Sequence, residues 1–351
     1  MDANGILAPF GAASAPFQER RAAMLEPASL ADLPAFRCAH AQDDAAGTGC
    51  TVIAAPDGAI CGVDVRGGGP ATRETDLLRP ENMVQKVHAV VLSGGSAFGL
   101  EASSGVMEAL AARGIGFQLA GAHVPIVVGA CLFDLLVGEN THPDAAMGCL
   151  AAERALDGGG TLAEGNIGAG TGASVGKLLG AERAMKSGFG LAGLRWGSLV
   201  CVALVAVNAL GHVNGADGRA LAGTRADDGT IMNPLEAFAR AAALAPPNAE
   251  DGGAPTTNTT IGCVLTNARL TKAQAAKSAS CVHDAYARAI KPVHTQNDGD
   301  TVFVMASGEE AADPDAVSVL ACEAMQRAIE RAATQATSAY GLPAARDLGT
   351  C

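Results

Sequence analysis

The C-terminal third of the chain alternates apolar strand-like runs with helical patterns, and this alternation constrains the fold more than any other feature. Residues 259–267, TTIGCVLTN, form an apolar run, and the sequence TKAQ at 271–274 then matches a capping box at the start of a helix. A second apolar run, 301–307, is followed by Asp313-Pro314, which is typical of a helix start. Helices that alternate with strands predict layers of helix and sheet, so the expected fold class is α/β.

The preceding part of the chain shows the same alternation with more glycine. We predict a β-hairpin from Cys50 onward with its turn at 56–58, a helix over 97–113 and a strand over 198–208. The segment 245–257 combines Pro, Gly and acidic residues with nothing to bury, so we expect an exposed loop there. Because the chain has 44 glycines and only 3% aromatic residues, its core is expected to consist of aliphatic side chains and closely approaching backbones.

The composition argues against several partners and compartments. The net charge is −12 and no block of Lys or Arg occurs, which argues against a nucleic acid partner. The ten cysteines are scattered without a CxxC pair, and several lie in apolar runs, so we expect them to be reduced and buried. The N-terminus lacks the pattern of a secretory signal, which predicts a cytoplasmic location. The longest apolar segments, 124–138 and 198–213, are too short or too interrupted to span a bilayer, so no membrane partner is expected.

The glycine-rich block GNIGAGTGASVGKLLG contains a G-x-G-x-x-A match at Gly168, Gly170 and Ala173. A dinucleotide site would need a preceding strand and an acidic residue about 20 positions later, and both are missing. We therefore interpret these glycines as permitting close backbone approach, and we expect no cofactor. Lys177, at the end of the block, is either a functional cation or a solvated residue.

Two carboxylates mark the entrance of the strand at 301–307. Asp298 and Asp300 are two residues apart, and this spacing puts both on one face. Such a pair can orient a nucleophile, tune its proton or hold a metal, and the alternative is an Asp-Gly turn. His283 and His294 lack the spacing of metal ligands, so we expect structural or packing roles for them and no metal site.

The sequence TTNTTIG at 256–262 places hydroxyl residues at the start of an apolar strand, directly after the predicted loop. Strand propensity alone could account for these threonines. A cut between Asn258 and Thr259 would instead expose a threonine whose free α-amine, with an unperturbed pKa of about 7.7–8.0, can act as the base for its own hydroxyl. The hydroxyl can also make the cut, by attacking the Asn258 carbonyl to give an ester that water resolves.

Five long motifs extend this interpretation: NTTIGCVLTNARLTK, KPVHTQNDGDTVF, RGGGPATRETDLL, HAVVLSGGSAFGLEASSGV and GAGTGASVGK. Through them the chain resembles the self-processing peptidases that include the D-aminopeptidase/D-esterase DmpA, the β-peptidyl aminopeptidases and the nylon-oligomer hydrolases. The resemblance implies an αββα four-layer sandwich of the ornithine acetyltransferase type, as one domain over 35–351 after an extension at 1–34. It also implies cleavage into an α subunit (1–258) and a β subunit (259–351), associated as a heterodimer within a homotetramer or larger assembly.

Carried onto this sequence, the resemblance also implies roles for individual residues. Thr259 is the nucleophile, and Asp298 and Asp300 position and polarise its amine and hydroxyl. Lys177 matches the lysine of the Gly-Lys element in the family. Asn208 ends a central strand and supplies an amide donor that stabilises the tetrahedral oxyanion.

The resemblance places the substrate pocket at Gly94, Gly95, Phe98 and Glu101, with backbone N–H groups near the two glycines sharing the oxyanion task. Phe98 stands where some relatives carry tyrosine, so it offers no phenolic hydrogen bond. Aminopeptidase members carry an acidic residue for the substrate ammonium where this chain has Gly-Ala-Cys at 129–131, and Glu101 is only a weak substitute candidate.

The predicted function is a self-cleaving N-terminal-threonine hydrolase of small peptides or amides, in the first place an aminopeptidase. Three alternatives remain: an amidase without a free-amine requirement, an acyltransferase, and a non-catalytic oligomeric binding protein.

Overall fold

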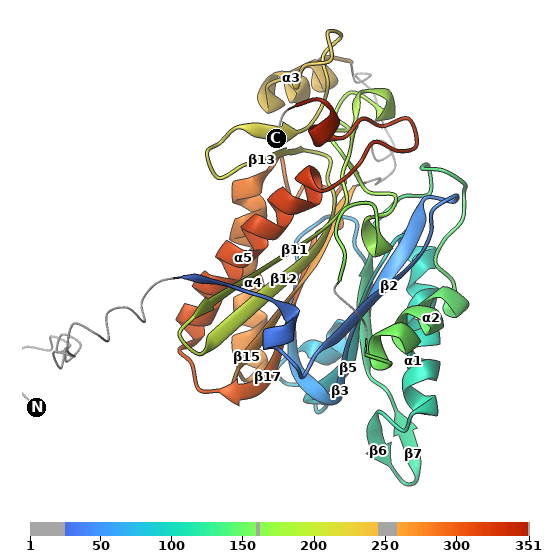
Figure 1. Cartoon of the computed structure of the whole chain (residues 1–351), viewed down its shortest axis with the longest axis vertical. Helices are drawn as coiled ribbons and strands as arrows, with labels where there is room; N and C mark the ends of the chain where they lie inside the picture. Colours follow the sequence, from blue (N-terminus) through green and yellow to red (C-terminus); the bar gives the residue numbers. More distant parts are fainter. Residues whose placement is uncertain (1–24, 159–161, 245–257, 350–351) are drawn as a thin grey trace, which may run out of the picture.

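The computed structural model describes residues 25–158, 162–244 and 258–349 (Figure 1). Ten strands of this part form one hydrogen-bonded sheet, in which β2 (Arg37–Asp43) pairs with β3 beside the main path. In spatial order the main path is β1 (Glu26–Ala28), β11 (Phe189–Trp196), β12 (Leu199–Asn208), β15 (Thr259–Ala268), β17 (Thr301–Glu310), β3 (Thr48–Val65), β5 (Lys86–Ser93), β8 (Val127–Cys131) and β4 (Ala71–Arg73). Neighbouring strands are antiparallel except for the parallel pairs β15 with β17 and β5 with β8.

The long strand β3 divides this sheet into two halves. Along one edge, its residues 48–54 pair with β2 and its residues 60–65 pair with β17. Its other edge pairs with β5, with a register shift after Ala54. The predicted hairpin with a turn at 56–58 is therefore wrong, because the chain passes through Gly58 (φ 73°) without reversing and turns back between β2 and β3 instead. Turn residues also suit a bulge, which bends one strand so that its two ends find different partners.

Helices cover the two outer faces of the sheet (Figure 1). On one side, α4 (Lys272–Ala289) and α5 (Pro314–Thr334) pack against β11, β12, β17 and the end of β3. On the other side, α1 (Ala102–Ala112) and α2 (Ala145–Leu156) pack against β2, β5, β8 and the start of β3. The two halves of the sheet form the two inner layers and the helix pairs form the two outer layers, which is the predicted αββα sandwich.

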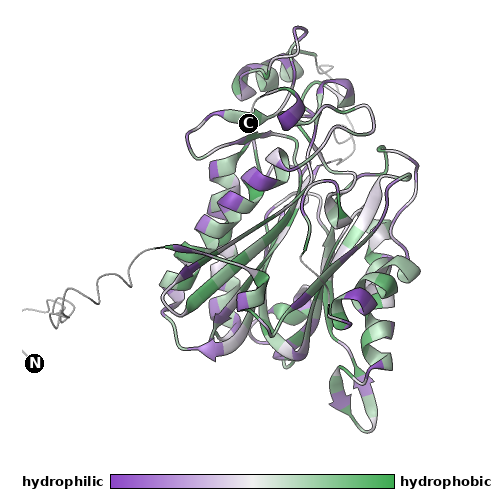
Figure 2. Cartoon of the chain, viewed as in Figure 1, coloured by the Kyte–Doolittle hydropathy of each residue, from purple (hydrophilic) through white to green (hydrophobic). Residues whose placement is uncertain are grey.

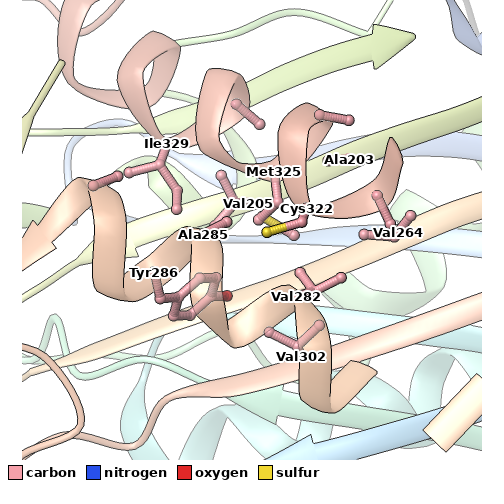
Figure 3. Close-up of a cluster of buried hydrophobic side chains, with 14 of the residues drawn as sticks. Ala203, Val205, Val264, Val282, Ala285, Tyr286, Val302, Cys322, Met325 and Ile329 are labelled. Atoms are coloured by element: carbon pink, nitrogen blue, oxygen red, sulfur yellow. The ribbon is translucent and has the colours of Figure 1, made fainter. Parts of the chain in front are cut away.

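Three apolar clusters hold these layers together, one under each pair of helices and one between the sheet halves. The middle cluster includes Ile53 and Leu92 from one half and Leu204 and Phe303 from the other, all fully buried. The cluster under α4 and α5 is mostly aliphatic and includes the aromatic ring of Tyr286 (Figure 3). The central strands are accordingly rich in hydrophobic residues (Figure 2). Each fully buried Val, Leu, Ile or Phe side chain stabilises the fold by about 1.5–3 kcal/mol.

The predicted C-terminal elements are confirmed as β15, α4, β17 and α5. At the start of α4, Thr271 N–H donates to Gln274 Oε1 at 2.8 Å and Gln274 N–H donates to Thr271 Oγ1 at 3.3 Å, which completes the capping box. The predicted strand over 198–208 is β12. The helix predicted over 97–113 differs at its start, because Ser96–Glu101 are wound as a tighter 3-10 helix before α1 begins.

Most of the described cysteines are buried, as predicted, but Cys149 and Cys281 are only partly buried. All nine described cysteines are free thiols, and seven of them are buried. Burial raises the pKa of Cys38, Cys50 and Cys201 to about 12 in each case, so these thiols stay protonated and act as small apolar side chains.

Part of the predicted N-terminal extension joins the folded domain. Residues 26–28 form β1 at the edge of the sheet, and Leu33 is 1% exposed. Residues 1–24 and the predicted loop at 245–257 lie outside the described residues. Within the described ranges, no helix is both long enough and apolar enough to cross a membrane.

Candidate active site

Thr259 begins β15 in the interior of the sheet, where it is only 4% exposed. Its hydroxyl donates a hydrogen bond to the carbonyl oxygen of the preceding residue, Asn258. The same carbonyl oxygen accepts the backbone N–H of Gly299 at 3.1 Å. The structure therefore holds the predicted cleavage bond between the Thr259 hydroxyl and a hydrogen-bond donor that polarises its carbonyl.

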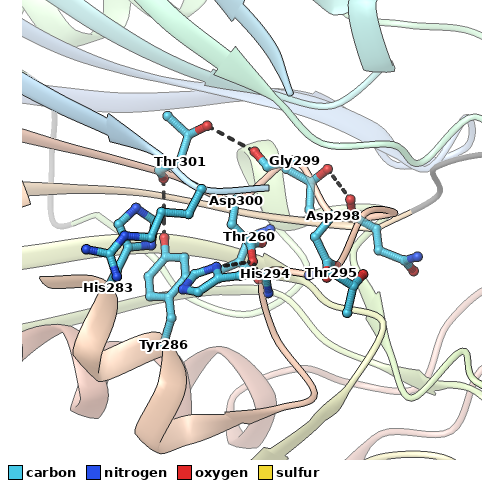
Figure 4. A network of polar contacts seen from close by, with 12 residues as sticks. Thr260, His283, Tyr286, His294, Thr295, Asp298, Gly299, Asp300 and Thr301 are labelled. Carbon is cyan, nitrogen blue, oxygen red and sulfur yellow. Dashed lines mark hydrogen bonds and ion pairs between the residues drawn. The ribbon is translucent and has the colours of Figure 1, made fainter. Parts of the chain in front are cut away.

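Asp300 directly precedes β17, the strand beside β15, and its carboxylate binds the start of β15 (Figure 4). Its Oδ1 accepts the backbone N–H of Thr260 at 2.8 Å, one residue after the predicted nucleophile. Its Oδ2 accepts both the backbone N–H and the ring Nδ1–H of His294, at 3.1 and 2.8 Å. Asp300 is 1% exposed, so these protein groups take the place of solvent around its carboxylate.

Asp298 lies on the other side of Gly299 and is fixed by its own turn. Its Oδ2 accepts the N–H of Thr295 at 2.8 Å and the hydroxyl of Thr295 at 2.6 Å. Burial raises the pKa of Asp298, the neighbouring Asp300 carboxylate adds to this, and the Thr295 bonds and the Lys177 ammonium oppose it. Asp298 therefore lies in a turn, as one of the two interpretations expected, and its carboxylate is buried near Thr259, while its role in catalysis stays a prediction.

Glycines bring the backbone of the segment after β3 against this turn. Gly69 N–H donates to the Asp298 carbonyl oxygen at 2.8 Å. A Cβ on Gly67 would lie 2.2 Å from that same oxygen, so only glycine fits there. The motif RGGGPATRETDLL therefore forms part of the wall of the site.

Asn208 stands directly opposite Thr259 in the antiparallel pair β12 and β15. Residues opposite each other in such a pair project from the same face, with Cβ atoms about 4.5–5.5 Å apart. Asn208 Oδ1 accepts Lys177 Nζ at 2.7 Å and the backbone N–H of Ser174 at 3.0 Å. Its Nδ2 donates to the Phe133 carbonyl oxygen at 2.8 Å, so the oxyanion role predicted for Asn208 requires the second Nδ2 hydrogen.

Lys177 contacts Asn208, and a second lysine, Lys186, contacts the segment that carries Lys177. Burial lowers the pKa of Lys177 to about 7, although the carboxylates of Asp298 and Asp134 act in the opposite direction. Lys186 is fully buried, and its ammonium donates to the carbonyl oxygens of Gly170, Ala173 and Ser187. The bonds to Gly170 and Ala173 hold the glycine-rich block that carries Ser174 and Lys177.

The glycines of that block serve close packing, as the sequence indicated. A Cβ on Gly170 would lie 2.1 Å from the backbone nitrogen of Phe189, and a Cβ on Gly176 would lie 2.1 Å from the carbonyl carbon of Gly223. In the described part of the chain, no group of three or more His, Cys, Asp and Glu side chains is arranged to hold a metal ion.

Gly94 and Gly95 contact the carboxyl group of Asp134. Gly95 N–H donates to Asp134 Oδ1 at 2.6 Å, and Asp134 Oδ2 accepts the Thr48 hydroxyl at 2.8 Å. A Cβ on Gly94 would lie 2.1 Å from Asp134 Oδ2, which explains the glycine. Burial raises the pKa of Asp134 to about 6. The Gly95 N–H is thus already bonded to a carboxylate in this structure.

Phe98 and Glu101 lie farther out. Phe98 is 66% exposed and its ring faces that of His142 at 5.5 Å. Glu101 Oε2 lies 3.3 Å from His142 Nε2. Within the described residues, no hydrogen bond or ion pair joins either side chain to Thr259, Lys177 or Asn208.

A pocket of about 630 Å³ opens beside Lys177 and the partners of Asn208. Its walls are mostly apolar, and three charged side chains line it, from Asp134, Lys177 and Glu182. The remaining lining residues are Phe133, Leu136, Val137, Gly138, Ser174, Leu178, Gly180, Ala181, Ala184, Tyr340, Gly341 and Leu342. A cavity of this size and composition accommodates a small organic substrate.

Several members of this network have a weak signal in the sequence or none. The ring of His294 binds Asp300, and the signal in the sequence is its position six residues before that aspartate. Asp134 and Lys186 gave no local signal, because Asp134 bonds to residues 39 and 86 positions away.

The sequence model of peptidase family S58 matches residues 28–344. An uncharacterized aminopeptidase of Mycobacterium leprae (strain TN) is 40% identical over 319 residues, which cover 84% of each chain. A second, from Mycobacterium tuberculosis (strain H37Rv), is 38% identical and covers 91% of this chain and 97% of its own. A 6-aminohexanoate-oligomer endohydrolase of Agromyces sp. (strain KY5R) is 33% identical and covers 79% of this chain and 74% of its own.

Two solved structures share the fold at lower sequence identity. A β-aminopeptidase of Burkholderia sp. superposes with a TM-score of 0.63 at 21% identity, covering 93% of this chain and 95% of its own. The L-aminopeptidase D-Ala-esterase/amidase of Ochrobactrum anthropi, described as a variant of the Ntn hydrolase fold, has a TM-score of 0.60 at 17% identity, with 86% and 84% covered.

Proposed function

This chain belongs to peptidase family S58, and we propose that it is a hydrolase that cleaves its own chain between Asn258 and Thr259. The observation that carries the proposal is the double hold on the Asn258 carbonyl, by the Thr259 hydroxyl and by Gly299 N–H. Attack of Thr259 Oγ1 on the Asn258 carbonyl carbon forms a C–O bond. Gly299 N–H then stabilises the oxyanion, as fixed backbone donors do in acyl transfer.

Collapse of this intermediate breaks the Asn258–Thr259 C–N bond, and a proton passes to the new amine. Water then hydrolyses the ester, which leaves the Asn258 carboxylate and a free Thr259 amine and hydroxyl. The two pieces stay joined, because β15 lies between β12 and β17 and is hydrogen-bonded to both. We also propose that the cleaved protein assembles into a larger homo-oligomer, as the resemblance implies, and that it is cytoplasmic.

In turnover, Thr259 Oγ1 attacks the carbonyl carbon of a small peptide or amide while its own α-amine takes the hydroxyl proton. The amine then protonates the leaving nitrogen, and water releases the acyl group from Thr259. Asp300 accepts the Thr260 N–H. The Asp298 carboxylate raises the pKa of Lys177 and so favours its charged form. Lys177 in turn fixes the amide group of Asn208, which faces the same side of the sheet as Thr259.

Aminopeptidase action is the first substrate class that we propose, and the pocket offers a group for the substrate ammonium. Among its three charged side chains, Asp134 is bonded to Gly95 and Thr48, and Lys177 is bonded to Asn208. The Glu182 carboxylate makes no hydrogen bond or ion pair within the described residues, and it folds back over Gly180 of the same pocket. A carboxylate at the mouth of an apolar pocket suits a cationic amine better than an anion.

A hydrolase of longer amides is the second candidate, because the chain is also 33% identical to a 6-aminohexanoate-oligomer endohydrolase. This reading needs no free amine at the scissile end. A pair of substrates that differ only in N-acetylation separates the two classes. Transfer of the acyl group to an added amine, in place of water, would identify an acyltransferase.

Intact mass under denaturing conditions tests the proposal. We expect purified protein to yield a fragment that starts at Thr259, and we expect Thr259→Ala to remain a single 34.9 kDa chain without hydrolytic activity. The variant removes only a hydroxyl and a methyl group, so the fold should persist. Cleavage of Thr259→Ala at the same bond would show that another group makes the cut. An intact, non-acylating wild-type chain would favour the non-catalytic binding protein.

A further inference from the structure

We propose that His294 is a positioning residue for this site, which holds the Asp300 carboxylate so that the start of β15 keeps its orientation. The inference rests on the proposed function and extends it to a side chain outside the reacting atoms. The two carboxylate oxygens of Asp300 have different hydrogen-bond partners. Oδ1 binds the Thr260 N–H next to the nucleophile, and among the described residues Oδ2 is held by His294 alone, through its ring and its backbone.

The backbone of His294 is bent to make this double contact. Its φ is 56°, in the left-handed region, which non-glycine residues adopt at an energetic cost unless the surroundings impose it. In this conformation both the N–H and the ring Nδ1 of one residue point at a single carboxylate oxygen. Strained residues that persist at a candidate site indicate a functional constraint.

Two aromatic side chains of α4 hold the ring in place. The ring of His283 meets the His294 ring edge-on with centroids 4.7 Å apart, and the Tyr286 ring stacks at 6.0 Å. His283 is itself held by its Nε2–H, which donates to the Asp64 carbonyl oxygen at 3.0 Å. Figure 4 shows these rings grouped beneath Asp300. The imidazole therefore cannot swing away from Asp300 without disturbing the packing of α4.

The hydrogen bonding of the ring is one-sided. Nδ1 lies 2.8 Å from a carboxylate oxygen, so it carries the donated hydrogen, while Nε2 is buried and has no hydrogen-bond partner in the part of the chain that the structure describes. All the polar contact of this imidazole is therefore directed at Asp300. A side chain that served packing alone would not need a nitrogen at this position.

Three variants at this position test the assignment. His294→Ala removes the ring bond, and His294→Asn replaces it, because an asparagine Nδ2 occupies about the place of histidine Nδ1 and asparagine tolerates positive φ. His294→Gln places its amide one bond too far. We expect His294→Ala to slow self-cleavage and lower kcat by about 10-fold or more with KM within about 3-fold, because small misplacements at a reacting centre are costly. His294→Asn should recover most of the rate and His294→Gln should not.

Self-cleavage is followed as intact mass against time, which needs no substrate, and acylation of Thr259 is followed with p-nitrophenyl acetate as the probe. The control is His88→Ala, which removes a buried imidazole that accepts Ile126 N–H at 3.1 Å near the start of β5. His88→Ala should leave both rates unchanged. If wild type neither cleaves itself nor acylates, the proposed function fails. If wild type is active and His294→Ala matches it, or His294→Asn falls as far as His294→Ala, the assignment of His294 is overturned while the proposed function stands.

Discussion

Replacing Gly299 by alanine should disable the site while leaving the fold intact. Gly299 lies between the two carboxylates, and a Cβ there would lie 2.8 Å from Thr259 Oγ1 and 3.2 Å from Thr259 Cγ2. Carbon atoms in favourable contact are about 3.5–4.0 Å apart. The Thr259 side chain would therefore have to shift by about 0.5–1 Å or turn to another rotamer. Gly299 is not in the left-handed region, so alanine meets no strain in φ, but its Cβ would also lie 3.0 Å from the Gly69 carbonyl oxygen, which would have to shift by a few tenths of an ångström.

The size of the effect follows from this displacement. A misplacement of about 1 Å at a reacting centre costs about 10²-fold in rate, so we expect self-cleavage and acylation to slow by about 10- to 100-fold. Overpacking by one methyl group costs the fold about 1–3 kcal/mol, which a domain with a free energy of unfolding of about 5–15 kcal/mol tolerates. Activity should therefore fall much further than stability.

Time-resolved intact mass, acylation by p-nitrophenyl acetate and chemical unfolding measure these quantities on one preparation. Gly215→Ala is the matched control, because the nearest atom to its Cβ is 3.1 Å away in the flexible side chain of Asp217 and its φ is not positive. We expect the control to behave as wild type. Wild-type rates in a folded Gly299→Ala protein would refute the reasoning, because the position of the Thr259 hydroxyl would then not matter.

Two further predictions concern stability. Burial raises the pKa of Asp134 from 3.8 to about 6, so between these values the folded protein holds a proton that the unfolded chain has released, and stability falls as pH rises through this window by about 3 kcal/mol. Asp134→Asn cannot ionise but keeps an acceptor for Gly95 N–H, so its unfolding free energy should lack this slope, and parallel curves for the two proteins would contradict the buried carboxylate. Thr271→Ala should lower the free energy of unfolding by about 1 kcal/mol through loss of the α4 cap, without changing the rate of self-cleavage. A matching loss of rate would show that the start of α4 is coupled to the site.

The elements that sequence analysis predicted best have strong local signals. The capping box at 271–274 and the apolar run at 259–267 act within a few residues, so they are readable without the rest of the molecule. The hairpin expected at 56–58 failed because the same local residues suit a turn or a bulge. What decides between them is whether residues 59–65 pair with the preceding segment or with β17, and that choice depends on the order of strands in the sheet.

The candidate site shows the same division. Motifs marked Thr259, Asp298 and Asp300, which lie at the starts of two adjacent parallel strands, and the structure places all three near the bond between Asn258 and Thr259. The substrate pocket implied at Gly94, Gly95, Phe98 and Glu101 stays a prediction. The side chains of Phe98 and Glu101 contact His142, and a separate cavity beside Lys177 is lined by Glu182. No local pattern links Glu182 to a pocket, because the walls come from three separate segments, within 133–138, 174–184 and 340–342.

Sequence by itself determined the α/β class, the start of β15 at a threonine and the presence of two carboxylates beside the next strand. These follow from spacing, turn chemistry and apolar periodicity, which operate between near neighbours. Tertiary structure alone decided which groups those carboxylates and lysines bind: His294 on Asp300, Gly95 on Asp134 and Asn208 on Lys177. Such contacts depend on register across the sheet and on the packing of layers, and burial then makes each unpaired charge so costly that its partner must be close by.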